Sequence, residues 1–304
     1  LGYYQRFMEA LPTVADLAEV EEDQLLKLWQ GLGYYNRARN LQKAARQVME
    51  QFGGQFPSTY ADLLSLAGVG DYTAGAIASI AFGLPEPAVD GNVLRVVTRI
   101  TGDPSDISQA ATKKAVRAAL AEVMPLQAPG DFNQALMELG ALVCLPNGAP
   151  DCAHCPARGF CVAHLEGKTD VIPVKGAKKP RKIEERTVYL LFYGGQVALR
   201  RRPAKGLLAG LWEFPNEVVG AAESAGWGME LTQAEVCGAG RHIFTHREWH
   251  MTGKQLVLTD DTLPDGWVWA DEQALRETYA VPNAFSAFLP TVEAYFAQWR
   301  GGLS

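Results

Sequence analysis

The spacing of apolar residues changes midway along the chain, near residue 166. Before that point apolar residues recur every three or four positions, as on one face of an α-helix; 38–52 is an example. After residue 186 short runs rich in strand-forming residues replace them, and Gly194-Gly195 joins two of these runs as in a β-hairpin. A chain of 304 residues is long enough for two hydrophobic cores. The sequence therefore predicts an all-α domain over 1–166 and an α+β domain over 187–304, joined by a Pro, Lys and Gly linker over 167–186.

Basic residues are concentrated locally in a chain whose formal net charge is −6. A net negative charge by itself argues weakly against a nucleic-acid partner. The segment 167–186, however, carries 7 Lys and Arg against 3 Asp and Glu, and it contains the basic run 175–182. Basic residues also recur at helical spacing, at Arg37, Arg39, Lys43 and Arg46. The alternatives to phosphate contacts are a solvated helix face and a flexible linker.

Nothing in the sequence predicts a membrane span, because no apolar run approaches the roughly 18 residues that one needs. The first residues also lack the basic and then apolar order of a signal peptide. We therefore expect a cytoplasmic protein without a membrane partner.

Four of the five cysteines lie close together with the spacing C-x7-C-x2-C-x5-C, at Cys144, Cys152, Cys155 and Cys161. A disulfide framework does not suit a cytosolic chain of this length. Structural zinc usually takes two CxxC-type pairs separated by a longer spacer. One CxxC flanked by single cysteines favours a 4Fe-4S cluster, in which each iron takes one thiolate. Zinc and free thiols remain alternatives, and the isolated Cys237 is expected in a core.

A glycine-rich loop, LAGVGDYTAGA over 66–76, separates two predicted helices. A dinucleotide or phosphate loop would need a preceding strand, and here the preceding pattern is helical and no Lys-Ser/Thr pair follows the glycines. A tight turn before a helix N-terminus instead offers backbone N–H groups to an anion. We therefore expect one phosphate of a DNA strand to bind there, and a plain helix–helix turn is the alternative. The residues expected to contact DNA are Gly68, Val69, Gly70 and Thr73.

Asp90 precedes Gly91 and the start of another predicted helix. By default an aspartate at such a position caps the helix N-terminus. The alternative is a catalytic carboxylate beside the bound strand.

Several segments resemble, in order, the motifs of the helix-hairpin-helix DNA glycosylases that carry an iron–sulfur cluster. Within that superfamily the likeness is to adenine DNA glycosylases of the MutY type. The segments are 29–41, 66–83, 88–96, 132–144 and the cysteine loop that follows. Further on, 200–215 and 242–249 resemble the Nudix-related C-terminal domain of those enzymes, which helps to recognise oxidised guanine. No Glu-rich metal-binding box follows Pro215, so we expect a Nudix-like recognition module without hydrolase activity.

The resemblance implies catalytic roles for three residues. Asp90 would stabilise the positive sugar that forms as the base leaves, Asn92 would hold Asp90, and Tyr72 would be a hydrogen-bonding neighbour. Relatives of the endonuclease III type have a lysine at the position of Tyr72, which forms a Schiff base with the sugar and permits strand cleavage. A phenol cannot form one. The resemblance therefore implies hydrolysis of the base–sugar bond alone, after the base has left the stack.

The resemblance also implies recognition residues and a substrate. Tyr34 matches an aromatic wedge that enters the base stack, with core packing as its alternative, and Arg37 lies beside it. Phe244, Thr245 and His246 match a Phe-Ser-His turn that touches oxidised guanine, and threonine keeps the hydroxyl of serine. The implied activity is removal of adenine opposite 8-oxoguanine or guanine in double-stranded DNA, by a monomer. The alternatives are an endonuclease III-like pyrimidine glycosylase and an inactive DNA-damage binding protein.

Two features depart from the family pattern. The family's proton donor is a glutamate on a helix that precedes a segment resembling 3–7, and we expect that glutamate to lie outside these 304 residues. We therefore expect the 304 residues alone to bind DNA but to remove adenine very poorly. Seven residues also separate Cys144 from Cys152 where six are usual, and we expect the extra residue to bulge outward between Pro146 and Pro150.

Overall fold

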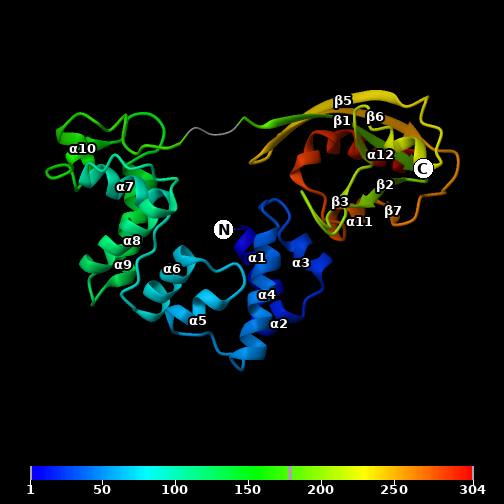
Figure 1. Ribbon diagram of the computed structural model, residues 1–304. Coiled ribbons are helices and arrows are strands. Elements are labelled where there is room, and N and C mark those ends of the chain that lie inside the picture. The colour runs from blue at the N-terminus through cyan, green and yellow to red at the C-terminus, as the bar shows by residue number, and fades with distance from the viewer. Residues whose placement is uncertain (1, 177–179, 303–304) are drawn as a thin grey trace. The chain divides into compact units, whose positions relative to one another are not determined.

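The computed structural model describes residues 2–176 and 180–302, and Figure 1 shows its helices and strands. The chain divides into two compact units. One contains 43–176, and the other joins 2–42 to 180–302. No helix within the described ranges is long and apolar enough to cross a lipid bilayer.

Helices build the described chain as far as residue 166, as predicted (Figure 1). They are α1 (Gly2–Ala10), α2 (Val14–Glu19), α3 (Glu22–Leu28), α4 (Asn36–Gln51), α5 (Tyr60–Ser65), α6 (Asp71–Phe82), α7 (Gly91–Thr101), α8 (Ala110–Val123), α9 (Pro129–Glu138), the π-helix η1 (Leu139–Val143), the 3-10 helix η2 (Cys152–His154) and α10 (Val162–Leu165). Local signals set several boundaries. The Thr59 side chain accepts a hydrogen bond from the Asp62 N–H at the start of α5. The helices α6 and α7 end at Gly83 and Gly102, whose backbones adopt the left-handed αL conformation.

The second half forms a mixed sheet with helical segments, which confirms the predicted α+β fold. Its elements are β1 (Lys182–Tyr193), β2 (Gln196–Arg201), β3 (Trp212–Glu213), β4 (Asn216–Val218), the 3-10 helix η3 (Glu223–Trp227), β5 (Glu235–Ile243), β6 (Arg247–Val257), β7 (Trp267–Ala270), α11 (Glu272–Glu277), the 3-10 helix η4 (Asn283–Phe288) and α12 (Leu289–Gly301). The strand order is β3-β2-β1-β6-β5, with β4 beside β1 and β7 beside β2. β1 and β6 are parallel, and the other pairs are antiparallel.

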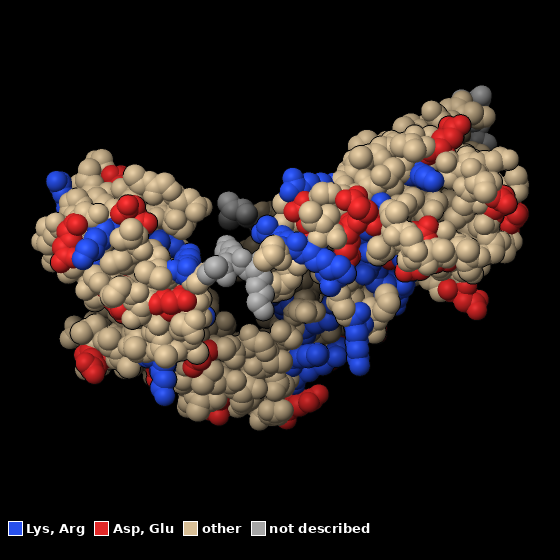
Figure 2. All heavy atoms as spheres, turned by 45° about the horizontal axis from the view of Figure 1, so that its top comes forward, with Lys and Arg blue, Asp and Glu red and all other residues tan. Residues whose placement is uncertain are grey.

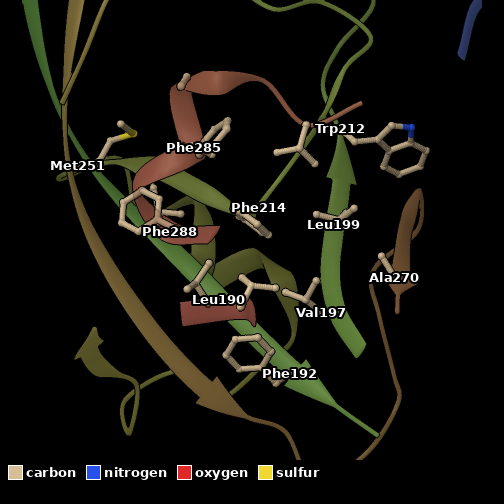
Figure 3. Close-up of a cluster of buried hydrophobic side chains, with 14 of the residues drawn as sticks. Leu190, Phe192, Val197, Leu199, Trp212, Phe214, Met251, Ala270, Phe285 and Phe288 are labelled. Atoms are coloured by element: carbon tan, nitrogen blue, oxygen red, sulfur yellow. The ribbon is translucent and has the colours of Figure 1, made fainter. Parts of the chain in front are cut away.

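The hairpin between β1 and β2 turns at Gly194 and Gly195, which have φ angles of 54° and 77°. Two successive positive φ angles are those of a type I′ turn, so the two-glycine signal predicted this hairpin correctly. Figure 3 shows the buried core beside it, where side chains of the sheet meet those of η4. Phe192, Phe214 and Phe285 are among the largest side chains buried in this unit.

The units differ from the predicted domain limits at two places. β1 begins at Lys182, inside the segment expected to be a linker, because 182–192 pairs in parallel with β6. Residues 2–42 group with the sheet rather than with the following helices. The reason is a shared apolar cluster, in which Leu26 and Tyr35 pack with Leu211 and Ala280. The basic run 175–182 includes residues 177–179, which lie outside the described residues.

Candidate functional site: a carboxylate, a cysteine loop and an exposed wedge

The Asp90 carboxylate is held at the N-terminus of α7. Its Oδ1 accepts a hydrogen bond of 2.8 Å from the Val93 N–H, which is the N-cap predicted as the default. Its Oδ2 accepts one of 3.1 Å from Asn92 Nδ2, so the structure brings Asp90 and Asn92 together as the resemblance implied. Both carboxylate oxygens therefore have a donor that fixes their direction, while the residue is only half-buried. Capping and a catalytic role are compatible in this geometry.

Arg95 determines which way the Asn92 amide points. Its guanidinium donates to Asn92 Oδ1 at 2.8 Å, to the Gly140 carbonyl at 2.7 Å and to the Cys144 carbonyl at 2.7 Å. Because Asn92 Oδ1 accepts from Arg95, its Nδ2 faces Asp90. Arg95 is buried, and burial is the main reason that its pKa is lowered. Sequence reasoning missed this residue, since the only signal was an arginine within the apolar run of α7.

Tyr72 lies within electrostatic reach of Asp90. The pKa of the Tyr72 phenol is raised, first by burial and then by the negative charge of Asp90. Its hydroxyl donates to Met137 Sδ at 3.5 Å, and 42% of the side chain is exposed. A neutral hydrogen-bonding group therefore stands near the carboxylate, where the resemblance placed it.

The glycine loop has the helical flanks that the sequence predicted. Gly68 has a φ of 75°, and Gly70 precedes α6 without any side chain capping the first-turn N–H groups. Gly68 and Gly70 are exposed, and Val69 and Thr73 are half-buried. The four residues expected to contact DNA thus surround a helix N-terminus with exposed backbone.

Gly75, the third glycine of the loop, permits a close approach to the segment before Asp90. A Cβ atom there would lie 2.2 Å from the Pro87 carbonyl oxygen. Asn133, which is completely buried, ties the same segment in place: its Nδ2 donates to Ser79 Oγ at 2.7 Å, and its Oδ1 accepts from the Ala88 N–H at 3.0 Å. Asn133 lies in the motif 132–144, but the sequence pattern predicted no role for it. The helix α6 is less buried than its apolar composition suggested, since Ile80 is 49% exposed.

Four thiols line one small cavity, those of Cys144, Cys152, Cys155 and Cys161. Burial is the first cause of a raised pKa at Cys152, and the negative charges of the other three thiols are the next causes. All four are free cysteines. Within 2–176 and 180–302, however, no three His, Cys, Asp or Glu side chains are arranged as ligands of a single metal ion.

Arg99 ties the cysteine loop to α7. It is 5% exposed, and its guanidinium donates to Cys144 Sγ at 3.2 Å, to the Leu145 carbonyl at 3.1 Å and to the Thr169 carbonyl at 2.7 Å. The loop after Cys144 is exposed over 146–149, and the Asp151 N–H closes its base by donating to the Val143 carbonyl at 3.0 Å. The longer spacing is thus accommodated at the surface, as predicted, and all four thiols still face one cavity.

Tyr34 is presented to solvent in the other unit, at the tip of the loop between α3 and α4. Its φ of 47° is rare for a tyrosine, and Gly31 and Gly33 beside it have φ angles of 97° and 66°. Trp29 Nε1 donates to the Gly33 carbonyl at 3.1 Å, and the Arg37 guanidinium lies 5.5 Å from the Tyr34 ring. The side chain is 73% exposed, which rules out core packing. An exposed ring held in a strained conformation is typical of a functional position.

The predicted recognition turn lies in the same unit as Tyr34. The Tyr34 hydroxyl is 3.5 Å from Thr245 Oγ1, and both residues line a hollow of about 660 Å³. Thr245 and His246 are exposed, whereas the Phe244 ring lies 4.9 Å from the buried Trp249 ring. The structure therefore brings Tyr34 together with Phe244, Thr245 and His246.

Charge around these residues is uneven. Figure 2 shows Lys and Arg side chains gathered on part of the drawn face rather than spread over it. Arg37 and Arg39 both line the hollow beside Tyr34. Local basic side chains can attract a phosphate backbone in spite of the net charge of −6.

Two family models match separate parts of the chain. The "HhH-GPD superfamily base excision DNA repair protein" model matches residues 1–125, and a "NUDIX domain" model matches residues 187–291. The structure of a thermostable thymine-DNA glycosylase has a TM-score of 0.50 and 28% identity, covering 54% of this chain and 76% of that chain.

Curated relatives match across both parts. The human adenine DNA glycosylase is 38% identical over 262 residues, which cover 71% of this chain and 48% of that protein. The adenine DNA glycosylase of Buchnera aphidicola subsp. Baizongia pistaciae is 36% identical over 219 residues, which cover 71% of this chain and 61% of that protein. This chain spans about half the length of the curated relatives it matches. The two domain matches and the curated relatives indicate the same family. The chain belongs to the MutY-type adenine DNA glycosylase family of the HhH-GPD superfamily.

Proposed function

We propose that the natural protein carrying this chain removes adenine from double-stranded DNA where it is paired with 8-oxoguanine or guanine, and that it leaves the strand uncut. The observation that carries the proposal is a fixed Asp90 carboxylate with the Tyr72 phenol within its electrostatic reach. A carboxylate with both oxygens held by donors stands near a phenol, and no amine occupies the position of Tyr72.

The roles of the residues follow from the charge that develops as the base leaves. Breaking the base–sugar bond gives the sugar positive character, which a fixed carboxylate stabilises electrostatically. Asn92 and the Val93 N–H prevent the Asp90 carboxylate from turning away. Water then takes the place of the base: its oxygen bonds to the sugar carbon and it gives up one proton, while the leaving adenine takes up one proton and departs as the neutral base. Because Tyr72 has no amine, it cannot form the Schiff base that would lead to strand cleavage.

Recognition of the opposite base is assigned to the other unit. The exposed Tyr34 ring is suited to stacking between bases, and stacking on an aromatic side chain is tolerant of base identity. The Thr245 hydroxyl, 3.5 Å from the Tyr34 hydroxyl, can hydrogen-bond to the groups that distinguish 8-oxoguanine from guanine.

We also propose that the cysteine loop binds a 4Fe-4S cluster. Four cysteines line one cavity, and one thiolate for each of four irons is the ligand set of a 4Fe-4S cluster. The buried Arg99 guanidinium beside Cys144 Sγ suits a thiolate ligand, because it supplies positive charge. When bound, the cluster would hold the loop in one conformation. Iron and zinc analysis with visible absorbance tests this assignment, and stoichiometric zinc without iron would contradict it.

A single-turnover assay of the natural protein tests the proposed reaction. The substrate is a duplex with adenine opposite 8-oxoguanine, and the expected product is an abasic site in an intact strand. Borohydride should trap no covalent complex. Release of thymine or another pyrimidine, with a trapped complex, would support a pyrimidine glycosylase, and DNA binding without any base release would support an inactive binding protein.

A further inference from the structure

The segment that carries Tyr34 is attached to the Nudix-like part by side chains that reach backbone carbonyls. Lys27 Nζ, at the end of α3, donates to the Leu275 and Tyr279 carbonyls, each at 3.0 Å. Gln30 Nε2 donates to the Val281 carbonyl at 2.8 Å. These bonds span about 250 residues of sequence, so they are tertiary and not local contacts.

These carbonyls lie where α11 ends and the chain continues to η4. The last carbonyls of a helix have no partner within the helix, so a lysine that donates to them satisfies them and complements the helix dipole. Asn283 Nδ2, further along the same segment, donates back to the Gly31 carbonyl at 3.4 Å. Bonds therefore run in both directions between 27–31 and 275–283.

The two segments joined by these hydrogen bonds, 27–31 and 275–283, are connected to the Tyr34 loop and to the turn 244–246, respectively. On one side, Lys27 and Gln30 directly precede the loop that holds Tyr34. On the other side, the Phe285 ring of η4 lies 6.0 Å from the Trp249 ring, which lies 4.9 Å from the Phe244 ring. Phe244 begins the turn that carries Thr245. A continuous chain of contacts thus connects these bonds to both elements.

We propose that Lys27 and Gln30 are positioning residues that hold Tyr34 opposite Thr245, so that the wedge and the turn grip 8-oxoguanine as one rigid clamp. The proposal rests on the proposed function, and it assigns preference for 8-oxoguanine over guanine to residues that need not touch DNA. Two exposed groups on separate segments keep a 3.5 Å separation only if the backbones beneath them are fixed.

The alternative is that these bonds only stabilise the fold. A purely stabilising role would lower affinity for both mispairs alike once the protein is less stable. A positioning role lowers the preference between mispairs, and it acts through Thr245. Binding can be measured without base release, by using a duplex whose adenine is replaced by an uncleavable analogue opposite either 8-oxoguanine or guanine.

The test compares Lys27→Met, Gln30→Leu and the matched control Lys114→Met in the natural protein. Lys114 is exposed on α8 of the other unit. We expect Lys27→Met to reduce the preference for 8-oxoguanine about tenfold, or ~1.4 kcal/mol, and the control to leave it unchanged. In a Thr245→Val background the same Lys27→Met change should alter the preference by less than about twofold. Gln30→Leu, which removes one bond instead of two, provides the test if Lys27→Met does not fold.

Three results would overturn the inference. They are an unchanged preference in folded Lys27→Met and Gln30→Leu, whether or not affinity for both mispairs falls equally, an undiminished effect in the Thr245→Val background, and the absence of any preference in the wild-type protein. The proposed reaction fails separately, when wild-type protein shows the preference in binding but releases no adenine. Wild-type protein without any preference would reject the clamp itself.

Discussion

The candidate catalytic residues in 43–176 and the candidate recognition residues in the other unit differ in what surrounds them. Asp90 and Asn92 are linked to one another, and beneath them Arg95 donates to Asn92 and to two backbone carbonyls. Tyr34 and Thr245 are exposed, and their place is set by backbone conformation and by packing further inside. Charge stabilisation requires fixed polar groups, whereas contact with DNA requires a surface that solvent can reach. The comparison predicts that substitutions around Asp90 lower the rate of base removal or the stability of the protein, and that substitutions at Tyr34 or Thr245 lower the affinity for DNA.

The largest expected effect is on the rate of base removal, and it tests whether the chemistry depends on the Asp90 charge. Asn at position 90 still accepts from the Val93 N–H and is an equally good N-cap, so stability should change little. We expect Asp90→Asn to slow single-turnover adenine removal about 1000-fold, because the developing sugar charge loses its carboxylate. Affinity for the duplex is the internal control. A variant that retains more than a tenth of the wild-type rate would show that another group stabilises the sugar.

Replacing Arg95 tests whether the polar network is essential to its unit. Arg95→Met leaves Asn92 Oδ1 and the carbonyls of Gly140 and Cys144 without this donor. We expect the free energy of unfolding to fall by about 3 kcal/mol and adenine removal to slow with it. Denaturant unfolding measures the first quantity, with Lys114→Met as the matched surface control. Equal free energies of unfolding for Arg95→Met and Lys114→Met would show that the Arg95 hydrogen bonds do not stabilise this unit.

A methyl group at Gly75 tests how closely the segment before Asp90 must approach α6. Its Cβ would lie 2.2 Å from the Pro87 carbonyl oxygen, so backbone has to move. We expect Gly75→Ala to lower the free energy of unfolding by about 2 kcal/mol. Gly91→Ala is the control, because a Cβ there meets no atom within 4 Å. If both variants unfold alike, the close approach has no energetic significance.

Removing the Tyr34 ring tests the recognition side of the comparison. The side chain is 73% exposed, so Tyr34→Ala should leave the free energy of unfolding within about 0.5 kcal/mol of wild type. Affinity for the mispaired duplex should weaken by about 1–2 kcal/mol, because one stacking contact is lost. Paired unfolding and DNA titrations decide the matter. A large loss of stability with unchanged affinity would make Tyr34 a structural residue.

The smallest expected effect is a pH dependence of stability from Lys27. Burial lowers its pKa from 10.5 to about 8, although the charge of Glu277 acts in the opposite direction. Between those pH values the unfolded chain holds a proton that the folded chain has released, so stability gains with rising pH. Wild-type stability relative to Lys27→Met should therefore increase from pH 8 to pH 10.5 and stay level below pH 8.

Other charged groups lie near Lys27, so the quantity to measure is the difference in free energy of unfolding between wild type and Lys27→Met. Glu272, Arg276 and Glu293 line the same pocket as Lys27 and carry charges of their own. They are common to wild type and Lys27→Met, as are all tyrosines and cysteines that titrate in this range. Denaturant unfolding at several pH values gives the two curves. Parallel curves would show that the Lys27 pKa is the same in the folded and unfolded chains.

The sequence by itself determined the fold class, the helix order and the positions of the cysteines. Apolar periodicity and turn residues are local signals, so the pattern over 38–52 and the Gly194-Gly195 pair predicted a helix and a hairpin that the structure confirms. The motif likeness also placed Asp90, Asn92 and Tyr72 in one neighbourhood. These signals repeat along the chain and need no knowledge of distant partners.

Only the tertiary structure decided what lies beneath those residues and which segments belong together. The roles of Arg95, Arg99 and Asn133 could not be assigned from the sequence, because the backbone carbonyls that the two arginines bind and the partners of Asn133 belong to other elements. The grouping of 2–42 with the sheet likewise depends on Leu26 and Tyr35 meeting Leu211 and Ala280, far apart in sequence. A buried donor has to be hydrogen-bonded, and its acceptor can come from any segment that the fold brings near it. The acceptor therefore cannot be identified from the neighbouring sequence.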